Sequence, residues 1–132
     1  DEHIKFISLE VNAGSVEKPE ASLKIEMNNE NKSIKINGNG PVDATFNAIK
    51  KLTSTDYKLK LYQVNAITAG TDAQGEVTVR LEDEDLTSQA KGSDPDIIVA
   101  SAKAYINALN RIIFKKSKSI KENSSNLQIR GV

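Results

Sequence analysis

Apolar and polar residues alternate along three short stretches in the first part of the chain, a pattern typical of strands with one buried face. The apolar positions are Ile7, Leu9 and Val11 in the first stretch, Ala21, Leu23, Ile25 and Met27 in the second, and Ile34 and Ile36 in the third. Turn-forming residues separate these stretches at 12–15 and 28–31, as in an antiparallel meander. The chain is therefore predicted to begin with three strands.

The hydrophobic period then changes to that of a helix. Apolar residues recur at helical spacing at Val42, Phe46, Ile49 and Leu52. The segment Gly38-Asn39-Gly40-Pro41 precedes them, and its proline suits the first helical position, where the N–H would have no partner within the helix. A first unit of three strands and one helix is predicted over about 4–53.

The second half of the chain repeats this order. The corresponding apolar positions are Tyr57, Leu59, Leu61, Val64 and Ala66, then Val77, Val79 and Leu81, then a short edge strand over 86–91, and finally Ile98, Ala102, Tyr105, Leu109 and Ile112 at helical spacing. A change of phase near Tyr62 predicts a β-bulge. The second unit is predicted over about 56–114.

The glycine and proline positions before the two helices also match. Gly38 aligns with Gly92 and Pro41 with Pro95 at the same offset of 54 (92 − 38 and 95 − 41). Equal offsets and an equal order of elements indicate an internal duplication. The predicted fold class is α+β, with two pseudo-symmetric βββα units that form a small two-layer domain over 1–114.

Residues 115–132 differ from the domain in composition. They are rich in lysine, serine and asparagine and contain little apolar content before Leu127, which predicts a flexible tail. The lysines over 115–121 suit the C-terminal end of a helix, whose dipole favours cations, better than they suit a phosphate-binding arm.

Composition excludes several classes of function. The 18 basic residues balance the 18 acidic ones, so the chain lacks the basic excess of a nucleic-acid binder. The chain contains no cysteine and one histidine, His3, which leaves little for metal binding or for Cys- or His-based catalysis. No apolar run approaches the roughly 20 residues of a membrane span, and no signal peptide is evident. We expect a non-catalytic, cytoplasmic domain without a cofactor. The start at Asp1 rather than at methionine suits a piece of a longer protein, and a processed precursor would show the same start.

The segment Gly38-Asn39-Gly40-Pro41 is the candidate ligand site. Amide donors and the positive end of the helix dipole converge on an anion at a helix start, and glycine lets the backbone approach a ligand. A plain turn between strand and helix would show the same residues. A second helix start at Asp94-Pro95-Asp96 favours the site, because two helix starts facing one cleft would supply amides for a carboxylate and acidic groups for an ammonium. A free amino acid carries both charges.

Three segments of the chain resemble the C-terminal regulatory domain shared by 2-isopropylmalate synthases and citramalate synthases. They are GNGPVDATFNAI from Gly38, YQVNAITAGTDAQGEVTVRLE from Tyr62 and DIIVASAKAYINALN from Asp96. The resemblance implies a homodimer that binds leucine or isoleucine as a feedback inhibitor near the dimer interface. It also implies a preceding (β/α)8 barrel with a divalent metal, which condenses acetyl-CoA with a 2-oxo acid. The acyltransferase activity would then belong to the full-length protein.

The candidate effector-binding residues come from two sources. The helix-start segment contributes Asn39 and Pro41, and the resemblance implies Gly38, Gly40, Asp43, Tyr62, Ala66, Ala73, Asp96 and Ile97. A small residue at Ala66 leaves room for the γ-branch of leucine, so the resemblance favours a leucine sensor of a synthase that uses 2-oxoisovalerate. An isoleucine sensor of a citramalate synthase is the alternative within the family, and a purely structural dimerisation module is the alternative outside it.

Overall fold

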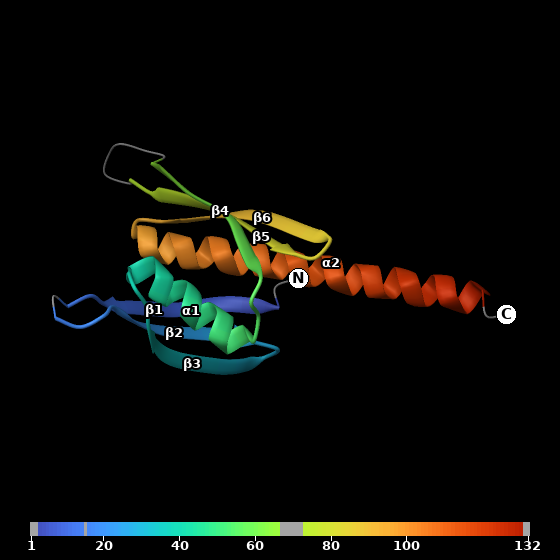
Figure 1. Cartoon of the computed structure of the whole chain (residues 1–132), viewed down its shortest axis with the longest axis horizontal. Helices are drawn as coiled ribbons and strands as arrows, with labels where there is room; N and C mark the ends of the chain where they lie inside the picture. The colour runs from blue at the N-terminus through green and yellow to red at the C-terminus, as the bar shows by residue number, and fades with distance from the viewer. Residues whose placement is uncertain (1–2, 15, 67–72, 131–132) are drawn as a thin grey trace.

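Each half of the chain forms a three-stranded antiparallel sheet followed by a helix (Figure 1). The computed structural model describes residues 3–14, 16–66 and 73–130, with side chains up to Ile120. The elements are β1 (Ile4–Asn12), β2 (Glu20–Met27), β3 (Glu30–Asn37), α1 (Pro41–Thr53), β4 (Lys58–Ala66), β5 (Gly75–Asp83), β6 (Leu86–Asp94) and α2 (Ile97–Arg130). The α+β class and the two βββα units predicted from the sequence are confirmed.

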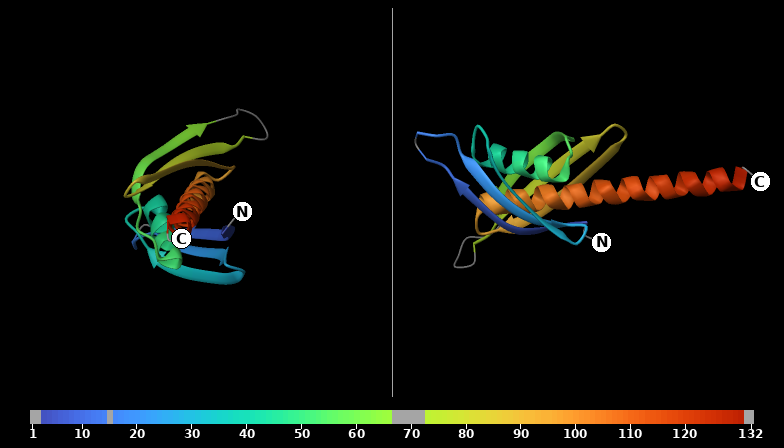
Figure 2. Two further views of the ribbon diagram at one scale, coloured as in Figure 1. Left: turned by 90° about the vertical axis from the view of Figure 1, so that its right-hand side faces the viewer. Right: turned by 90° about the horizontal axis from the view of Figure 1, so that it is seen from below.

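The two helices lie between the two sheets, as Figure 1 and the left view of Figure 2 show. Helix α1 packs on β1, β2 and β3, whereas α2 packs on β5 and β6 and also contacts β1. The sequence predicted two layers, with each helix on its own sheet. Because α2 contacts both sheets, the two units share one core, and the domain has three layers.

The predicted inner faces of the strands and the helical stripes make up this core. Its fully buried members include Leu23, Ile25, Ile49, Val77, Val79, Leu81, Tyr105, Leu109 and Ile112. Burial of side chains of this size stabilises a fold by about 1.5–3 kcal/mol each before the loss of conformational entropy is counted. The shared core is therefore what holds the two units together.

The first strand of each unit contains a β-bulge. The register of β1 against β2 shifts around Ile7, and that of β4 against β5 shifts around Lys60, two residues before the predicted position at Tyr62. The bulge in β1 was not predicted from the sequence. It leaves Ile7, which was expected in the core, 45% exposed, because an extra residue changes the face to which the following side chains point.

Helix α2 is longer than the sequence predicted. The sequence predicted a flexible tail over 115–132, and in the described part of this segment the backbone is helical to Arg130. This segment contains no glycine or proline before Gly131, and extending a packed helix adds one hydrogen bond for each residue fixed. The end of α2 projects beyond both sheets (Figure 1).

Polar side chains of α2 bind the edges of two strands. Three of them, each one turn from the next, donate to alternate carbonyls of β6: Asn107 to Lys91, Arg111 to Gln89 and Lys115 to Thr87. The Asn110 side-chain amide of α2 accepts from the Ile4 N–H at 2.9 Å and donates to the Ile4 carbonyl at 2.8 Å. Open strand edges recruit further strands, so α2 protects β6 along these carbonyls and β1 at Ile4.

One segment of α2 has the length and composition of a membrane span. Within this segment, Ile97–Ile120, a window of 18 residues has a mean hydropathy of 1.3, and half of that window is buried inside the domain. The sequence pattern predicted no apolar run close to that length. Core helices pass the same test of length and composition, and the burial of α2 against both sheets accounts for its apolar residues.

The Tyr105 hydroxyl is buried without a hydrogen-bond partner in the part of the chain that the structure describes. Burial, together with the charges of Asp56 and Tyr57, raises the pKa of Tyr105 to about 12. The ring itself packs 4.7 Å from that of Phe46. The ring of Tyr105 therefore stabilises the core by packing, whereas its unpaired hydroxyl destabilises the fold.

Replacing this hydroxyl tests that reading. An unpaired buried polar group costs about 1–3 kcal/mol, so Tyr105→Phe should leave the free energy of unfolding unchanged or raise it by up to about that amount in urea denaturation. The control is Ser88→Ala, which removes a buried hydroxyl that donates to the Ala108 carbonyl and should lower stability by about 1 kcal/mol. A clear loss of stability in Tyr105→Phe would show that its hydroxyl has a partner.

Candidate functional site

Both helices begin at the same end of the molecule, near the end of β4 and the start of β5 (Figures 1 and 2). The predicted site residues at or near this end are the segment 38–41 and Asp43 from the first unit, and Tyr62, Asp96 and Ile97 from the second. Both pseudo-symmetric units thus place predicted site residues toward the same end of the molecule.

The start of α1 has no side-chain cap among the residues that the structure describes. Gly40 is its N-cap residue in an extended conformation (φ −155°, ψ 172°). Pro41 has no N–H, and the amides of Val42 and Asp43 lie too early in the helix to find an acceptor within it. The first helical bond runs from the Ala44 N–H to the Gly40 carbonyl at 2.9 Å. These amides and the helix dipole favour an anion here.

The two glycines of this segment have different roles. A Cβ on Gly38 would lie 2.3 Å from the main-chain nitrogen of Ala44, whereas a Cβ on Gly40 would meet nothing within 4 Å. Gly38 is required for the close packing of the end of β3 against α1. Gly40 leaves space at the surface, where a ligand can approach the backbone.

Asp43 places a negative charge beside the same amides. Its carboxylate accepts hydrogen bonds from the Asn39 N–H at 2.7 Å and from the Asn47 side-chain amide at 3.5 Å. These bonds hold the glycine segment in its conformation. The negative charge of Asp43 would repel a simple anion here. A ligand with a cationic group close to its carboxylate therefore fits better.

The start of α2, in contrast, is capped by its own side chain. Asp96 Oδ1 accepts from the N–H groups of Ile98 at 2.8 Å and Val99 at 3.4 Å, which makes Asp96 the N-cap. The helix consequently begins at Ile97, two residues after Pro95, which the duplication had aligned with the helix start. The α2 start therefore offers carboxylate oxygens more than amides.

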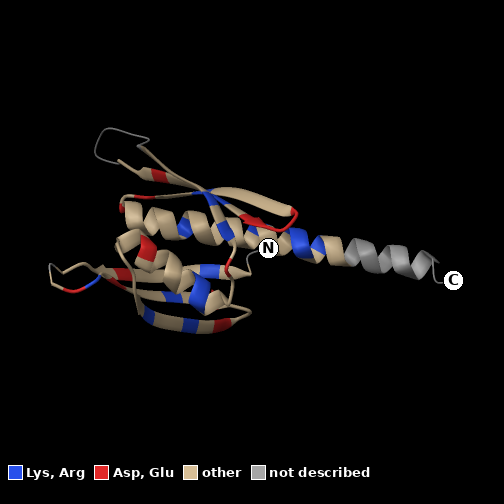
Figure 3. Ribbon diagram, in the orientation of Figure 1, with Lys and Arg blue, Asp and Glu red and all other residues tan. Residues whose placement is uncertain are grey.

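Asp94 adds a second carboxylate at the α2 start. It accepts from the Asp96 N–H at 3.0 Å and pairs with the Lys103 ammonium at 3.0 Å. Burial acts to raise the pKa of Asp94, but these two interactions outweigh burial and hold the pKa below its ordinary value of 3.8. Figure 3 shows acidic residues at both helix starts. Their negative charges favour a cationic group on a ligand whose anionic group binds the α1 amides.

Tyr62 connects β4 to both helices. Its hydroxyl lies 2.7 Å from Ser101 Oγ, and its ring meets that of Phe46 edge-on at 5.6 Å. Because Ser101 Oγ also donates to the Ile97 carbonyl at 2.8 Å, the tyrosine is the donor of the pair. The sequence did not identify Ser101 or Phe46 as partners of Tyr62. Phe46 was assigned to the apolar stripe of the first helix, and a single serine in an alanine-rich helix gives no sequence signal of a contact.

Ile97 packs on the strand pair at the end of β4. A Cβ on Gly75 would lie 1.9 Å from Ile97 Cδ1, and Gly75 pairs with Ala66, the last residue of β4. Ala73 is exposed just before β5. The structure thus places Ile97 over the strand pair that Ala66 ends, while the connection over 67–72 lies outside the described residues.

Other surface features do not contain the predicted site residues. A groove of about 570 Å³ crosses the first sheet and is lined by side chains such as Ser8, Lys24 and Ser33. Among the residues that the structure describes, no group of three or more His, Cys, Asp or Glu side chains is placed to hold a metal ion. The chemistry of the site consists of amides, carboxylates and one tyrosine hydroxyl.

The family model and the individual relatives that match this chain indicate the same family. Residues 1–113 match the model of the LeuA allosteric (dimerisation) domain. A 2-isopropylmalate synthase of Rhodopseudomonas palustris (strain TIE-1) is 46% identical over 130 residues, which cover 98% of this chain and 25% of that enzyme. The 2-isopropylmalate synthase of Afipia carboxidovorans is 48% identical over 117 residues (89% and 22%), and that of Bradyrhizobium sp. (strain BTAi1) is 44% identical over 124 residues (94% and 24%). The chain spans about a quarter of the length of these relatives.

Proposed function

The chain belongs to the LeuA allosteric (dimerisation) domain family, and from this premise we propose that it is the leucine-sensing feedback domain of a dimeric 2-isopropylmalate synthase. The acyltransferase activity, which joins acetyl-CoA to 2-oxoisovalerate, would belong to a barrel with a divalent metal elsewhere in the full-length protein. The domain itself would use no cofactor. The cytoplasmic location expected from the sequence is part of this proposal.

The observation that carries the proposal is the difference between the two helix starts. The α1 start has uncapped amides beside the open surface at Gly40, and the α2 start has the carboxylates of Asp94 and Asp96. An α-amino acid presents a carboxylate and an ammonium two bonds apart. In our proposal its carboxylate binds the α1 amides, and its ammonium binds Asp96 or Asp43.

The residues beside these groups suit an aliphatic side chain. Ile97 packs over Gly75, which pairs with Ala66, and Tyr62 turns its hydroxyl away to Ser101. A leucine side chain would then lie against apolar surface of the second unit. Discrimination from isoleucine by shape amounts to about 1–3 kcal/mol in such a pocket.

Bound leucine would bridge the two units. The glycine segment belongs to the first unit, whereas Tyr62, Asp96 and Ile97 belong to the second. Leucine would thus stabilise one arrangement of the units over others, and an allosteric coupling of about 1–3 kcal/mol to the catalytic barrel would give feedback inhibition.

Calorimetric titration of the chain with leucine, isoleucine and valine tests the proposal. We expect saturable binding of leucine at one site per chain, with isoleucine weaker. Leucinamide, which lacks the carboxylate, and 4-methylpentanoate, which lacks the ammonium, should each bind at least about 10-fold more weakly, because each loses a charge-assisted contact. A dimer that gives no heat and no thermal shift with any of the three amino acids would be a structural module. Tighter binding of isoleucine would indicate a citramalate synthase.

A further inference from the structure

Two consecutive hydrogen bonds link Tyr62 of the candidate site to the first turn of α2. The Tyr62 hydroxyl donates to Ser101 Oγ at 2.7 Å, and Ser101 Oγ donates to the Ile97 carbonyl at 2.8 Å. Ser101 is 0% exposed. The ring of Tyr62 is held as well, because it meets the Phe46 ring edge-on at 5.6 Å. Ser101 therefore sets the direction of the Tyr62 hydroxyl.

The first helix contains a buried hydroxyl at the position equivalent to Ser101. Thr45 Oγ1 donates to the Pro41 carbonyl at 2.8 Å, as Ser101 does to Ile97. Pro41 and Ile97 are each the first residue of their helix, and both pairs have the same offset of 56 (97 − 41 and 101 − 45). Thr45 is also 0% exposed. The two hydroxyls are thus pseudo-symmetric.

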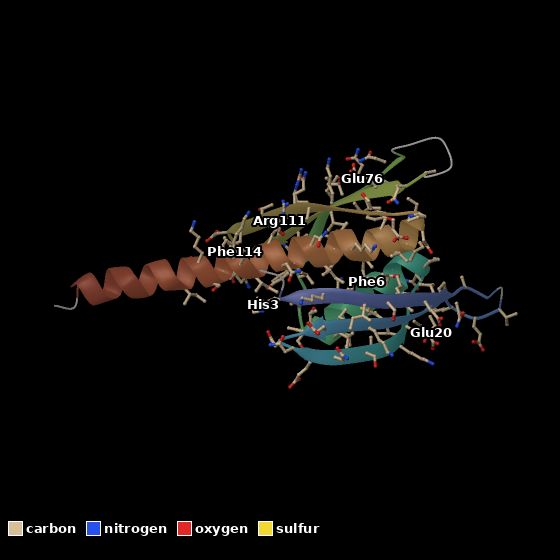
Figure 4. All side chains as sticks on the ribbon, turned by 180° about the vertical axis from the view of Figure 1, so that it is seen from behind. His3, Phe6, Glu20, Glu76, Arg111 and Phe114 are labelled. Atoms are coloured by element: carbon tan, nitrogen blue, oxygen red, sulfur yellow. The ribbon has the colours of Figure 1, made fainter. Side chains whose placement is uncertain are left out.

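Only the second of these hydroxyls accepts from a tyrosine in the part of the chain that the structure describes. The side chains of β1 that pack against the core are apolar and include Phe6, which Figure 4 labels, Leu9 and Val11. The first unit thus forms its sheet and helix without a bond from strand to helix of the kind that Tyr62 makes. Because the βββα fold does not need this bond, the bond is available for a role at the site.

We propose that Ser101 is a positioning residue that makes the effector site selective for an aliphatic side chain. This inference rests on the proposed function, in which leucine lies beside Tyr62 and Ile97. Because Ser101 holds the hydroxyl inside the domain, Tyr62 presents only its ring to the ligand. Asparagine has nearly the shape of leucine but ends in an amide, and burial of a polar group without a partner is unfavourable. The site rejects asparagine because the Tyr62 hydroxyl is already bonded.

Ser101→Ala leaves the Tyr62 hydroxyl without its acceptor. The hydroxyl then bonds to water in the site or to a polar group of the ligand, which disfavours leucine and favours asparagine. We expect the unmodified chain to bind leucine at least about 30-fold more tightly than asparagine. This ratio should fall about 10-fold in Ser101→Ala. The double variant Tyr62→Phe, Ser101→Ala contains neither hydroxyl and should regain the original ratio.

Calorimetric titration of each protein with leucine and with asparagine measures this ratio. Thr45→Val is the matched control, because it removes the equivalent buried hydroxyl and keeps the shape of the side chain. It should leave the ratio unchanged. A merely structural role of Ser101 would change the melting temperature without changing the ratio. An unchanged ratio in Ser101→Ala, an equal fall in Thr45→Val, or no recovery in the double variant would each overturn the proposal.

Circular dichroism verifies that each variant is folded. If Ser101→Ala does not fold, Ser101→Cys takes its place, because a thiol keeps the shape of the side chain and is a weaker acceptor. The ratio should then fall several-fold, and an unchanged ratio would overturn the proposal. The titration also separates the two inferences. An unmodified chain that binds no leucine would overturn the proposed function and this inference together, whereas leucine binding with an unchanged ratio in the Ser101 variant would overturn this inference alone.

Discussion

Gly92→Ala should lower the free energy of unfolding by about 3 kcal/mol or more. A Cβ at this position would lie 2.4 Å from the main-chain nitrogen of Ala104 and 2.6 Å from the carbonyl oxygen of Ala100. Both atoms belong to the backbone of α2, which packs on both sheets, so neither can move without shifting the helix. Overpacking of a core commonly costs about 1–3 kcal/mol, and a clash with a fixed backbone exceeds that range.

Urea denaturation followed by circular dichroism measures this loss. Gly38→Ala should behave similarly, because its Cβ would lie 2.3 Å from the Ala44 nitrogen. Gly40→Ala is the control within the same segment, with no atom within 4 Å of the new Cβ, and should change stability by less than about 0.5 kcal/mol. Equal stability of Gly92→Ala and Gly40→Ala would contradict the packing role of Gly92.

The sequence predicted the positions of these glycines but not their roles. The equal spacing of Gly38 and Gly92 correctly indicated a duplication, and local periodicity gave both helices and the meanders. The sequence treated Gly38 and Gly40 alike, as ligand-binding glycines. The distance between a strand end and the helix that crosses it is a property of the folded chain, which a local pattern does not contain.

The errors along the chain have local physical causes. The bulge at Ile7 inserts one residue into a regular alternation. The sequence pattern assumed a single alternation of inward and outward side chains along the strand, whereas the alternation shifts at the bulge. The segment after Phe114 has the polar composition of a tail, yet it continues a helix that tertiary packing has already formed. Composition predicts the conformation of an isolated segment. Here the packed part of α2 that precedes the segment determines its helical conformation.

The candidate site was only partly predictable for the same reason. Asp43 and Asp96 could be named from their places near helix starts, but the asymmetry between an uncapped α1 and an α2 capped by Asp96 needed the hydrogen bonds. The contact of Tyr62 with Ser101 joins residues 39 positions apart. No periodicity or spacing encodes such a pair.

Gly40→Ser should weaken leucine binding by about 10- to 100-fold without destabilising the fold. Gly40 has an extended backbone, which any residue adopts, and open space where a Cβ would stand. Serine is also a favoured N-cap residue, so the variant should be at least as stable as the unmodified chain. Its side chain would occupy the approach to the α1 amides and compete for them. Loss of one charge-assisted hydrogen bond, about 1.5–3 kcal/mol, accounts for the expected change.

Calorimetric titration of leucine into the unmodified chain and into Gly40→Ser measures whether an amino acid binds at the glycine segment. Thermal unfolding of both proteins without ligand provides the control for folding. We expect saturable binding to the unmodified chain and an affinity at least about 10-fold lower in the variant, at equal or higher melting temperature. The same affinity in both proteins would show that Gly40 belongs to a turn without a ligand.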